Sequence, residues 1–249
     1  SAGASAPESA TIDVPAIQTV LRSDGLDAWL LYDFRGTNPI ANGITAADQQ
    51  GGHLATRRWF YLVPATGEPR ALVHAIESRA LAHLPGSASQ YAGREQLERG
   101  LSQLLSGVRR VAMEYSPDCA IPYVSRVDAG TVELVRKNGV EVVSSGDLVQ
   151  QFSASWDDAA IATHRAASER LYRIKDRAFE LIARSTRGGG RTDEFEIQQR
   201  MAQWFREEGL VSDSEPNVSA SENAGNPHYL PTRGASRAFG SNELVLLDL

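Results

Sequence analysis

The residues best suited to chemistry lie near the end of the sequence. His228 sits in a loop between Pro227 and Pro231, and the fixed φ angles of the two prolines restrict that loop. Asp248 follows the apolar run 244–247, which is typical of a buried strand that delivers a carboxylate to the rim of a sheet. An imidazole can exchange protons near neutral pH, and a carboxylate can ligate a divalent cation. Taken singly, each is also explained as a surface histidine or a strand-end acid.

Other residue clusters have simpler interpretations. The run 188–190 is Gly-Gly-Gly, but it lacks the Lys-Ser/Thr of a phosphate-binding loop and follows a helix, which indicates a linker. No serine lies in a G-x-S-x-G pattern. Arg57-Arg58-Trp59 is most simply an exposed strand end, although it could also recognise a carboxylate or serve a subunit interface. The remaining histidines lack the spacing of a zinc site and are interpreted as structural or surface residues: His53, His74, His83 and His164.

Composition limits the classes of function. The 249 residues are 42% hydrophobic and 22% charged, which is typical of a soluble globular protein. A net charge of -6 argues against nucleic acid as a partner, and no apolar stretch is long enough to cross a membrane. Cys119 is the single cysteine, so no intrachain disulfide can form and a cytoplasmic location is expected. Residues 1–10 are predicted to be a disordered tail.

The region 11–152 alternates helix and strand patterns. Helices are predicted to start at Asp13 and to cover 96–105 and 123–136. Buried strands are predicted at 27–32, 110–115 and 140–143, and a hairpin at 59–63 and 71–74. This alternation predicts an α/β domain with helices packed on a central sheet.

A second region, 153–249, is predicted to begin near Ser153. Ser155-x-x-Asp158 has the form of a capping box, followed by a long helix with an apolar stripe that includes Ile161, His164, Leu171, Ile174, Ala178, Leu181 and Ile182. Thr192 is predicted to cap a second helix, whose first turn carries Asp193 and Glu194 as charges suited to the helix dipole. Ile197, Met201, Trp204 and Phe205 are predicted to form its buried face.

The order of these features resembles one metallopeptidase family. Segments 30–39 (LLYDFRGTNP), 112–117 (AMEYSP) and 121–130 (IPYVSRVDAG) resemble the N-terminal domain of bacterial Xaa-Pro peptidases. Segment 192–197 (TDEFEI) resembles a helix start in their catalytic domain. Asn226-Pro-His-Tyr229 and Leu246-Leu-Asp-Leu249 resemble the first two active-site segments of the family that contains prolidases, Xaa-Pro aminopeptidases, methionine aminopeptidases and creatinase.

The resemblance implies a creatinase-like N-terminal α/β domain at 11–152, and the first, incomplete part of a pita-bread αβ catalytic domain at 153–249. It implies a Xaa-Pro dipeptidase or aminopeptidase that hydrolyses the bond before a proline at the second position of a peptide. Two divalent ions, manganese before cobalt or zinc, would activate a bridging water. His228 would be the catalytic histidine that hydrogen-bonds the substrate or the tetrahedral intermediate, and Asp248 the first metal ligand. A homodimer is also implied.

The sequence departs from the family pattern after Asp248. The family's second Asp, its later His and two Glu do not occur here, and one carboxylate cannot hold two ions. We therefore expect an N-terminal portion of a longer enzyme that is inactive alone and retains no metal stably. Two alternatives remain open at this point. One is a catalytically silent peptide- or protein-binding module of the same fold, and the other is a metal-free amidinohydrolase like creatinase in which His228 is the acid and base.

Overall fold

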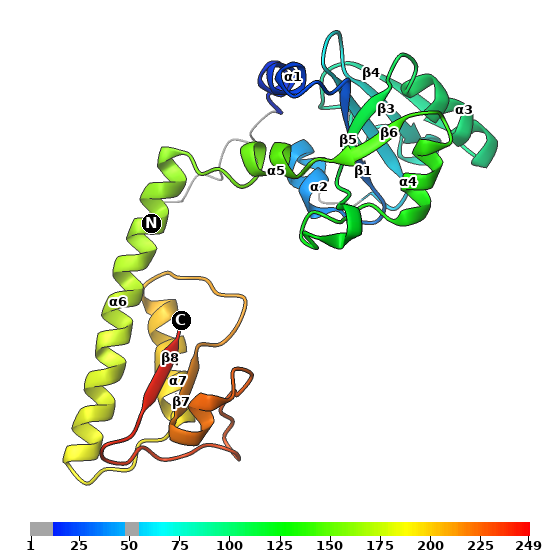
Figure 1. Ribbon diagram of the computed structural model, residues 1–249. Coiled ribbons are helices and arrows are strands. Elements are labelled where there is room, and N and C mark those ends of the chain that lie inside the picture. The colour runs from blue at the N-terminus through cyan, green and yellow to red at the C-terminus, as the bar shows by residue number, and fades with distance from the viewer. Residues whose placement is uncertain (1–11, 48–54) are drawn as a thin grey trace. The chain divides into compact units, whose positions relative to one another are not determined.

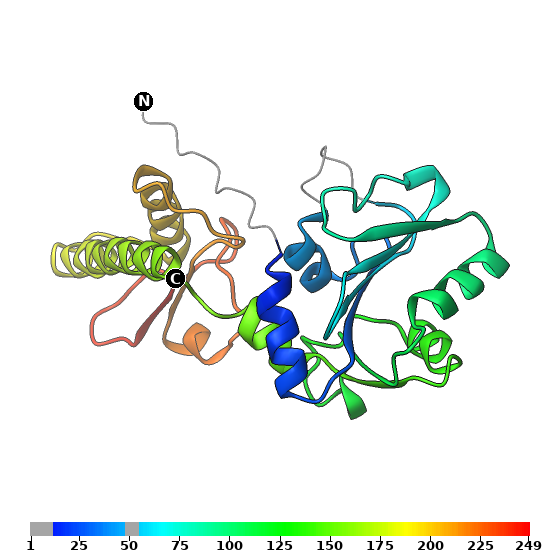
Figure 2. The same cartoon turned by 90° about the horizontal axis from the view of Figure 1, so that it is seen from above.

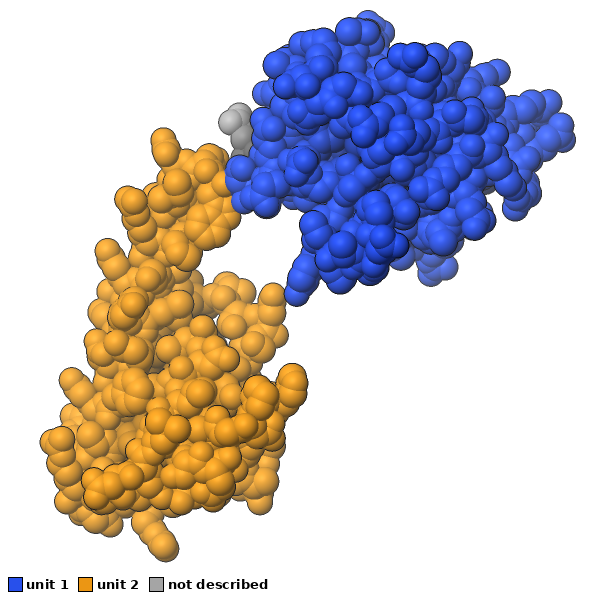
Figure 3. All heavy atoms as spheres, in the orientation of Figure 1, with its two compact units in different colours: residues 1–155 blue, residues 156–249 orange. Residues whose placement is uncertain are grey.

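The computed structural model describes residues 12–47 and 55–249. The chain forms two compact units, Ser1–Ser155 and Trp156–Leu249, which are coloured separately in Figure 3. The predicted tail at 1–10 and His53 lie outside the described residues. No helix in the described ranges combines the length and the apolar character that a membrane span requires.

A six-stranded sheet forms the centre of unit 1, with the strand order β4-β3-β2-β1-β5-β6 (Figure 1). β2 runs antiparallel to both of its neighbours, and the other pairings are parallel. The carboxyl ends of the five remaining strands therefore share one edge of the sheet. The strands are β1 (Ala28–Asp33), β2 (Trp59–Pro64), β3 (Arg70–His74), β4 (Ser87–Tyr91), β5 (Arg110–Met113) and β6 (Glu141–Ser144).

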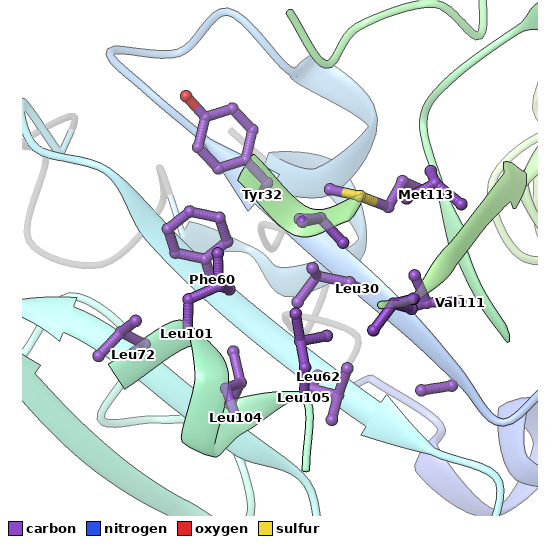
Figure 4. Packing of buried hydrophobic residues seen from close by; sticks show 14 of the residues in the cluster. Leu30, Tyr32, Phe60, Leu62, Leu72, Leu101, Leu104, Leu105, Val111 and Met113 are labelled. Atoms are coloured by element: carbon purple, nitrogen blue, oxygen red, sulfur yellow. The ribbon is translucent and has the colours of Figure 1, made fainter. Parts of the chain in front are cut away.

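Helices cover both faces of this sheet, which is why β1 and β2 are buried at every residue. One face packs against α3 (Arg94–Leu104) and α4 (Ala129–Arg136), and Figure 4 shows Leu101 and Leu104 of α3 lying against the strands. The other face packs against α1 (Val14–Ser23), α2 (Pro39–Thr45) and α5 (Gly146–Phe152). α1 and α5 lie side by side there (Figure 2). Short 3-10 turns η2 (Ala75–Glu77) and η3 (Pro117–Cys119) complete the unit.

Several predictions for unit 1 are confirmed, and one helix start is wrong. The hairpin of β2 and β3 forms with Phe60 opposite Leu72. The helix predicted from residue 123 begins only at Ala129, because the Asp128 side chain accepts a 2.9 Å hydrogen bond from the Thr131 amide and caps the helix there. α2 has no counterpart among the predicted helices; the Asn38 side chain caps it by accepting a hydrogen bond from the Ala41 amide.

Unit 2 consists of two helices and a two-stranded sheet. α6 (Asp158–Arg187) and α7 (Glu194–Glu207) pack together, and β7 (Asn217–Ala220) packs against α7. The 3-10 turn η4 (Ser221–Gly225) follows β7, and β8 (Val245–Asp248) pairs antiparallel with β7. All four side chains predicted for the buried face of α7 are buried: Ile197, Met201, Trp204 and Phe205.

Three helix predictions for unit 2 require correction. Asp157, which accepts from the Ala160 amide, caps α6 in place of Ser155. Asp193, which accepts from the Glu196 amide, caps α7 in place of Thr192. The apolar stripe of α6 is buried only at Ile174, Ala178 and Ile182. His164 is exposed, and the centroid of its ring lies 4.7 Å from the centroid of the Trp156 ring.

Candidate functional site

His228 and Asp248 lie at the same hollow in unit 2, which has a volume of about 520 Å³. His228 comes from the His228 loop, defined here as residues 226–237, and its side chain is exposed. Its backbone amide donates a 3.0 Å hydrogen bond to Oδ1 of Asn226. Asp248 ends β8 directly opposite Asn217 of β7. Loop residues Asp213 and Glu215 also line the hollow.

The pairing of β7 with β8 explains why Asp248 faces the hollow. Directly paired residues of an antiparallel sheet project to the same face. Val218 and Leu247 form one such pair and pack into the core, so the neighbouring pair of Asn217 and Asp248 projects to the opposite face. β8 is consequently half exposed, with Leu246 39% exposed. The expectation of a buried strand at this position is therefore wrong.

The carboxylate of Glu194 accepts hydrogen bonds from residues near both ends of the His228 loop and from the segment that precedes it. It is fully buried at the first residue of α7. It accepts hydrogen bonds from the Ala220 amide at 2.7 Å, from the Asn223 side-chain amide at 3.0 and 3.1 Å, and from the Arg237 amide at 2.9 Å. The Tyr229 hydroxyl donates a further short hydrogen bond. One buried side chain thus connects α7 to β7, η4 and both ends of the loop.

The Tyr229 hydroxyl remains a proton donor in this network. Burial raises its pKa, and the hydrogen bond to the Glu194 carboxylate raises the pKa further. Ionising the hydroxyl would place a second negative charge beside the buried Glu194 carboxylate. Tyr229 directly follows His228 in the chain, so this hydrogen bond fixes the backbone next to the candidate catalytic histidine.

Arg237 connects the end of the loop to the turn before β8. Its guanidinium forms two hydrogen bonds with the Glu243 carboxylate and lies 3.0 Å from Oε1 of Glu222. Glu243 also accepts from the Gly240 amide at 2.8 Å. The paired carboxylate raises the pKa of Arg237, and Arg237, followed by the Gly240 amide, lowers the pKa of Glu243. Both groups are therefore charged at neutral pH.

The first backbone amides of a helix have no hydrogen-bond partners within the helix. At the start of α7, the His228 loop supplies such partners. The Glu194 amide donates to the Arg237 carbonyl at 3.1 Å, and the Phe195 amide donates to Oγ of Ser236 at 2.9 Å. The Phe239 amide in turn donates to the Thr192 carbonyl at 3.0 Å. Residues 236–239 and 192–195 are thus tied together along their backbones.

The other sequence candidates lie elsewhere. His74 accepts from the Ile76 amide at 3.2 Å, and the His83 ring lies 2.6 Å from the Thr45 carbonyl, so both have structural partners. Arg57 and Arg58 line a hollow of about 770 Å³ in unit 1. Trp59, predicted as part of an exposed strand end, is buried.

The described residues do not fit a metal centre by themselves. Within 12–47 and 55–249, no three His, Cys, Asp or Glu side chains are grouped so that they could hold an ion. Asp248 is the one predicted ligand, and a divalent ion in a protein usually takes several oxygen or nitrogen ligands. Asp248 therefore supplies a single ligand.

Sequence reasoning misses Glu194 and Arg237 as organising residues. An acidic residue at the start of a helix is usually explained by its favourable interaction with the helix dipole. From the sequence alone, this explanation is sufficient for Glu194. Its partners come 26 to 43 residues later in the sequence, and no local pattern predicts such contacts. The one available signal is Tyr229, a hydroxyl donor placed directly beside His228.

Sequence comparison finds no match, whereas structural comparison finds proteins with a similar fold. No known family model matches this sequence, and no curated protein is significantly similar to it. A dipeptidase PepE from Mycobacterium ulcerans has a similar structure, with a TM-score of 0.64 at 14% identity over 94% of this chain and 58% of that chain. A prolidase from Pyrococcus horikoshii gives 0.55 at 14% identity over 94% and 59% of the two chains. A Xaa-Pro dipeptidase from Bacillus anthracis gives the same values.

These likenesses concern the fold. The sequence predicts an α/β fold with a creatinase-like N-terminal part followed by part of a pita-bread fold. Solved structures that match 94% of this chain confirm this fold. The chain spans 58 to 59% of the length of these three structures.

Proposed function

We propose that this chain forms part of a Xaa-Pro metallopeptidase, a hydrolase that cleaves the bond before a proline at the second position of a peptide. The observation that carries the proposal is the meeting of His228 and Asp248 at one hollow of unit 2. Its support is the fold shared with proteins described as a prolidase and a Xaa-Pro dipeptidase. A homodimer in the cytoplasm belongs to the same proposal.

His228 and Asp248 have separate roles in this proposal. The exposed imidazole of His228 would donate a hydrogen bond to the substrate carbonyl, or to the oxyanion that forms when the carbonyl is attacked. Asp248 would contribute one carboxylate to a pair of divalent ions, with manganese favoured by oxygen ligands. Together with further ligands Asp248 would help to hold such ions, and the chemistry that they would supply is Lewis-acid activation of water. Because one carboxylate cannot hold two ions, the proposal requires ligands outside these 249 residues, and it assigns no activity to this chain alone.

The test is a peptidase assay on two proteins, the 249-residue chain and the product of the complete reading frame. The complete product should release proline from Xaa-Pro dipeptides when manganese is supplied, and the 249-residue chain should not. In the complete product, D248N should lower metal content and turnover together. H228A should lower turnover while metal content stays at the wild-type value. The proposal is wrong if the complete product contains no further ligand set and releases no proline.

A second candidate function is peptide binding without catalysis. The observation in its favour is that Asp248 has no grouped ligand partners among the described residues, while the hollow beside it remains large enough for a small peptide. Calorimetric titration of the complete product with a Xaa-Pro dipeptide, after chelation, separates the two functions. Binding without turnover, in a protein that holds no metal after dialysis against manganese, favours the binding module.

A further inference from the structure

Glu194 does more than its position at the start of α7 requires. The capping acceptor of that helix is already supplied by Asp193, which accepts from the Glu196 amide at 2.8 Å. All donors to Glu194 come instead from residues 220–237. A carboxylate buried at 0% exposure loses the hydration of its charge, so its retention needs compensating hydrogen bonds.

The compensation comes from neutral donors. No Lys, Arg or His side chain forms an ion pair with Glu194 in the described part of the chain; the contact with Arg237 uses the backbone amide. Hydrogen bonds to a charged acceptor are shorter and stronger than those to a neutral one. Each donor is therefore held at a defined position around the carboxylate, and the segment that carries the donors is held with it.

Glu194 and His228 are connected through a single residue, Tyr229, and hydrogen bonds restrain the turn that contains it. Tyr229, whose hydroxyl reaches Glu194, donates its own backbone amide to the Asn226 carbonyl at 3.0 Å. The His228 amide donates to the side chain of the same Asn226. Pro227 fixes one further backbone angle in this turn. Anchoring the Tyr229 ring therefore fixes the turn that presents the imidazole to the hollow.

We infer that Glu194 is a positioning residue for His228: its buried carboxylate accepts hydrogen bonds from Tyr229, Asn223, the Ala220 amide of β7 and the Arg237 amide of the loop, and so sets where the imidazole lies. The role of the imidazole in peptide hydrolysis rests on the proposed function above. The positioning itself can be measured in the 249-residue chain without any turnover.

The test compares E194Q with the wild-type chain by amide hydrogen exchange and by NMR of the imidazole side chains. Glutamine keeps the size of the side chain and one oxygen, but its NH₂ group faces donors where the second oxygen accepted them. Exchange of the Arg237 amide and of neighbouring loop amides should accelerate about 10- to 100-fold. The His228 imidazole resonances should shift and lose order, while the amides of Met201 and Trp204 in α7 keep their protection.

E196Q is the matched control, because it makes the same chemical change in the same helical turn at an exposed side chain. It should leave loop exchange and the His228 signals unchanged. Should E194Q fail to fold, Y229F removes only one donor and should loosen the turn around His228 to a smaller degree. Unchanged imidazole signals in Y229F, or in a folded E194Q, would overturn the inference. Equal acceleration across all of unit 2 in E194Q would also overturn it, since that result indicates general destabilisation.

Activity of the complete reading-frame product separates this inference from the proposed function. If the product is a peptidase, E194Q should lower kcat with little change in KM, because a displaced imidazole affects the transition state more than binding. If the product releases no proline while the loop signals still change in E194Q, the proposed function fails and the positioning role stands. If the product releases proline while the loop signals stay unchanged in E194Q, the positioning role fails and the proposed function stands.

Discussion

The indole nitrogen of Trp29 donates a 2.7 Å hydrogen bond to the carboxylate of Glu114, and both side chains are fully buried in unit 1. Asn38 and Ser145 donate to the same carboxylate at 2.8 and 3.1 Å. The four residues come from β1, the end of β5, the cap of α2 and the end of β6. Glu114 in unit 1 and Glu194 in unit 2 are thus built alike, as buried carboxylates surrounded by neutral donors that tie together distant segments.

Replacing Glu114 by alanine should destabilise unit 1 by at least about 3 kcal/mol, because three buried donors lose their acceptor. Urea unfolding followed by tryptophan fluorescence measures the loss. E141A is the matched control on the exposed end of β6, where Glu141 forms only a 3.5 Å surface ion pair with Arg110. It should cost less than about 1 kcal/mol. Equal losses in the two variants would contradict the prediction.

The stability of unit 1 should carry a pH dependence from Glu114. Burial raises the pKa of its carboxyl above the ordinary 4.5, against the opposing hydrogen bonds from Trp29, Asn38 and Ser145. Between 4.5 and the raised pKa, the folded state binds more protons than the unfolded state. The free energy of unfolding should therefore fall as pH rises through this window. Unfolding series from pH 4 to 8, compared with E114Q, should show a decline in the wild type that E114Q lacks.

Unit 2 should show the opposite dependence at lower pH. Arg237 holds the pKa of Glu243 below its ordinary 4.5, with a further contribution from the Gly240 amide. The stabilisation from this contact should be complete above pH 4.5 and should be lost as pH falls through the lowered pKa. Acid unfolding of E243Q should be less steep in this range than that of the wild type. E222Q, at a carboxylate 70% exposed, should keep the wild-type slope.

Gly86 should not tolerate a side chain. Its φ is +99°, and a Cβ there would overlap the carbonyl oxygen of Pro69, the residue that precedes β3. G86A should therefore destabilise unit 1 by about 3 kcal/mol or more through strain and steric overlap together. Gly107 is the control position: its φ is +79°, but a Cβ there would meet no neighbouring atom, so alanine would add backbone strain without steric overlap. G107A should cost only about 1 to 2 kcal/mol in the same thermal unfolding measurement.

Local patterns predict the buried elements of the fold well. β1 and the β2–β3 hairpin are predictable because apolar side chains on both faces leave a continuous hydrophobic run. β4 is not predictable in this way, because it is an edge strand with four exposed residues and carries no such run. The predicted start of α4 is too early because residues 123–127 have helix-compatible side chains, and only the acceptor geometry of Asp128 determines where the helix begins.

The candidate site is predictable only in part. His228 and Asp248 are identified by their chemistry, but the sequence does not state that both line one hollow. That proximity depends on the register in which Asp248 pairs with Asn217. Glu194 is not recognisable as an anchor, because burial of a helix-start acid is decided by residues far along the chain. The resemblance to a family predicts which residues form the site, and packing determines how they are arranged.

The sequence separation of the Glu194 contacts has a consequence for the order of folding. α6 and α7 are neighbours along the chain, so their packing closes a short connection and can form early. The bond between Glu194 and the Arg237 amide closes 43 residues and requires β7, η4 and the turn to be in place. We expect the His228 loop to acquire its structure last during refolding. Mutations in α7 would then slow folding, and mutations at Tyr229 would mainly speed unfolding.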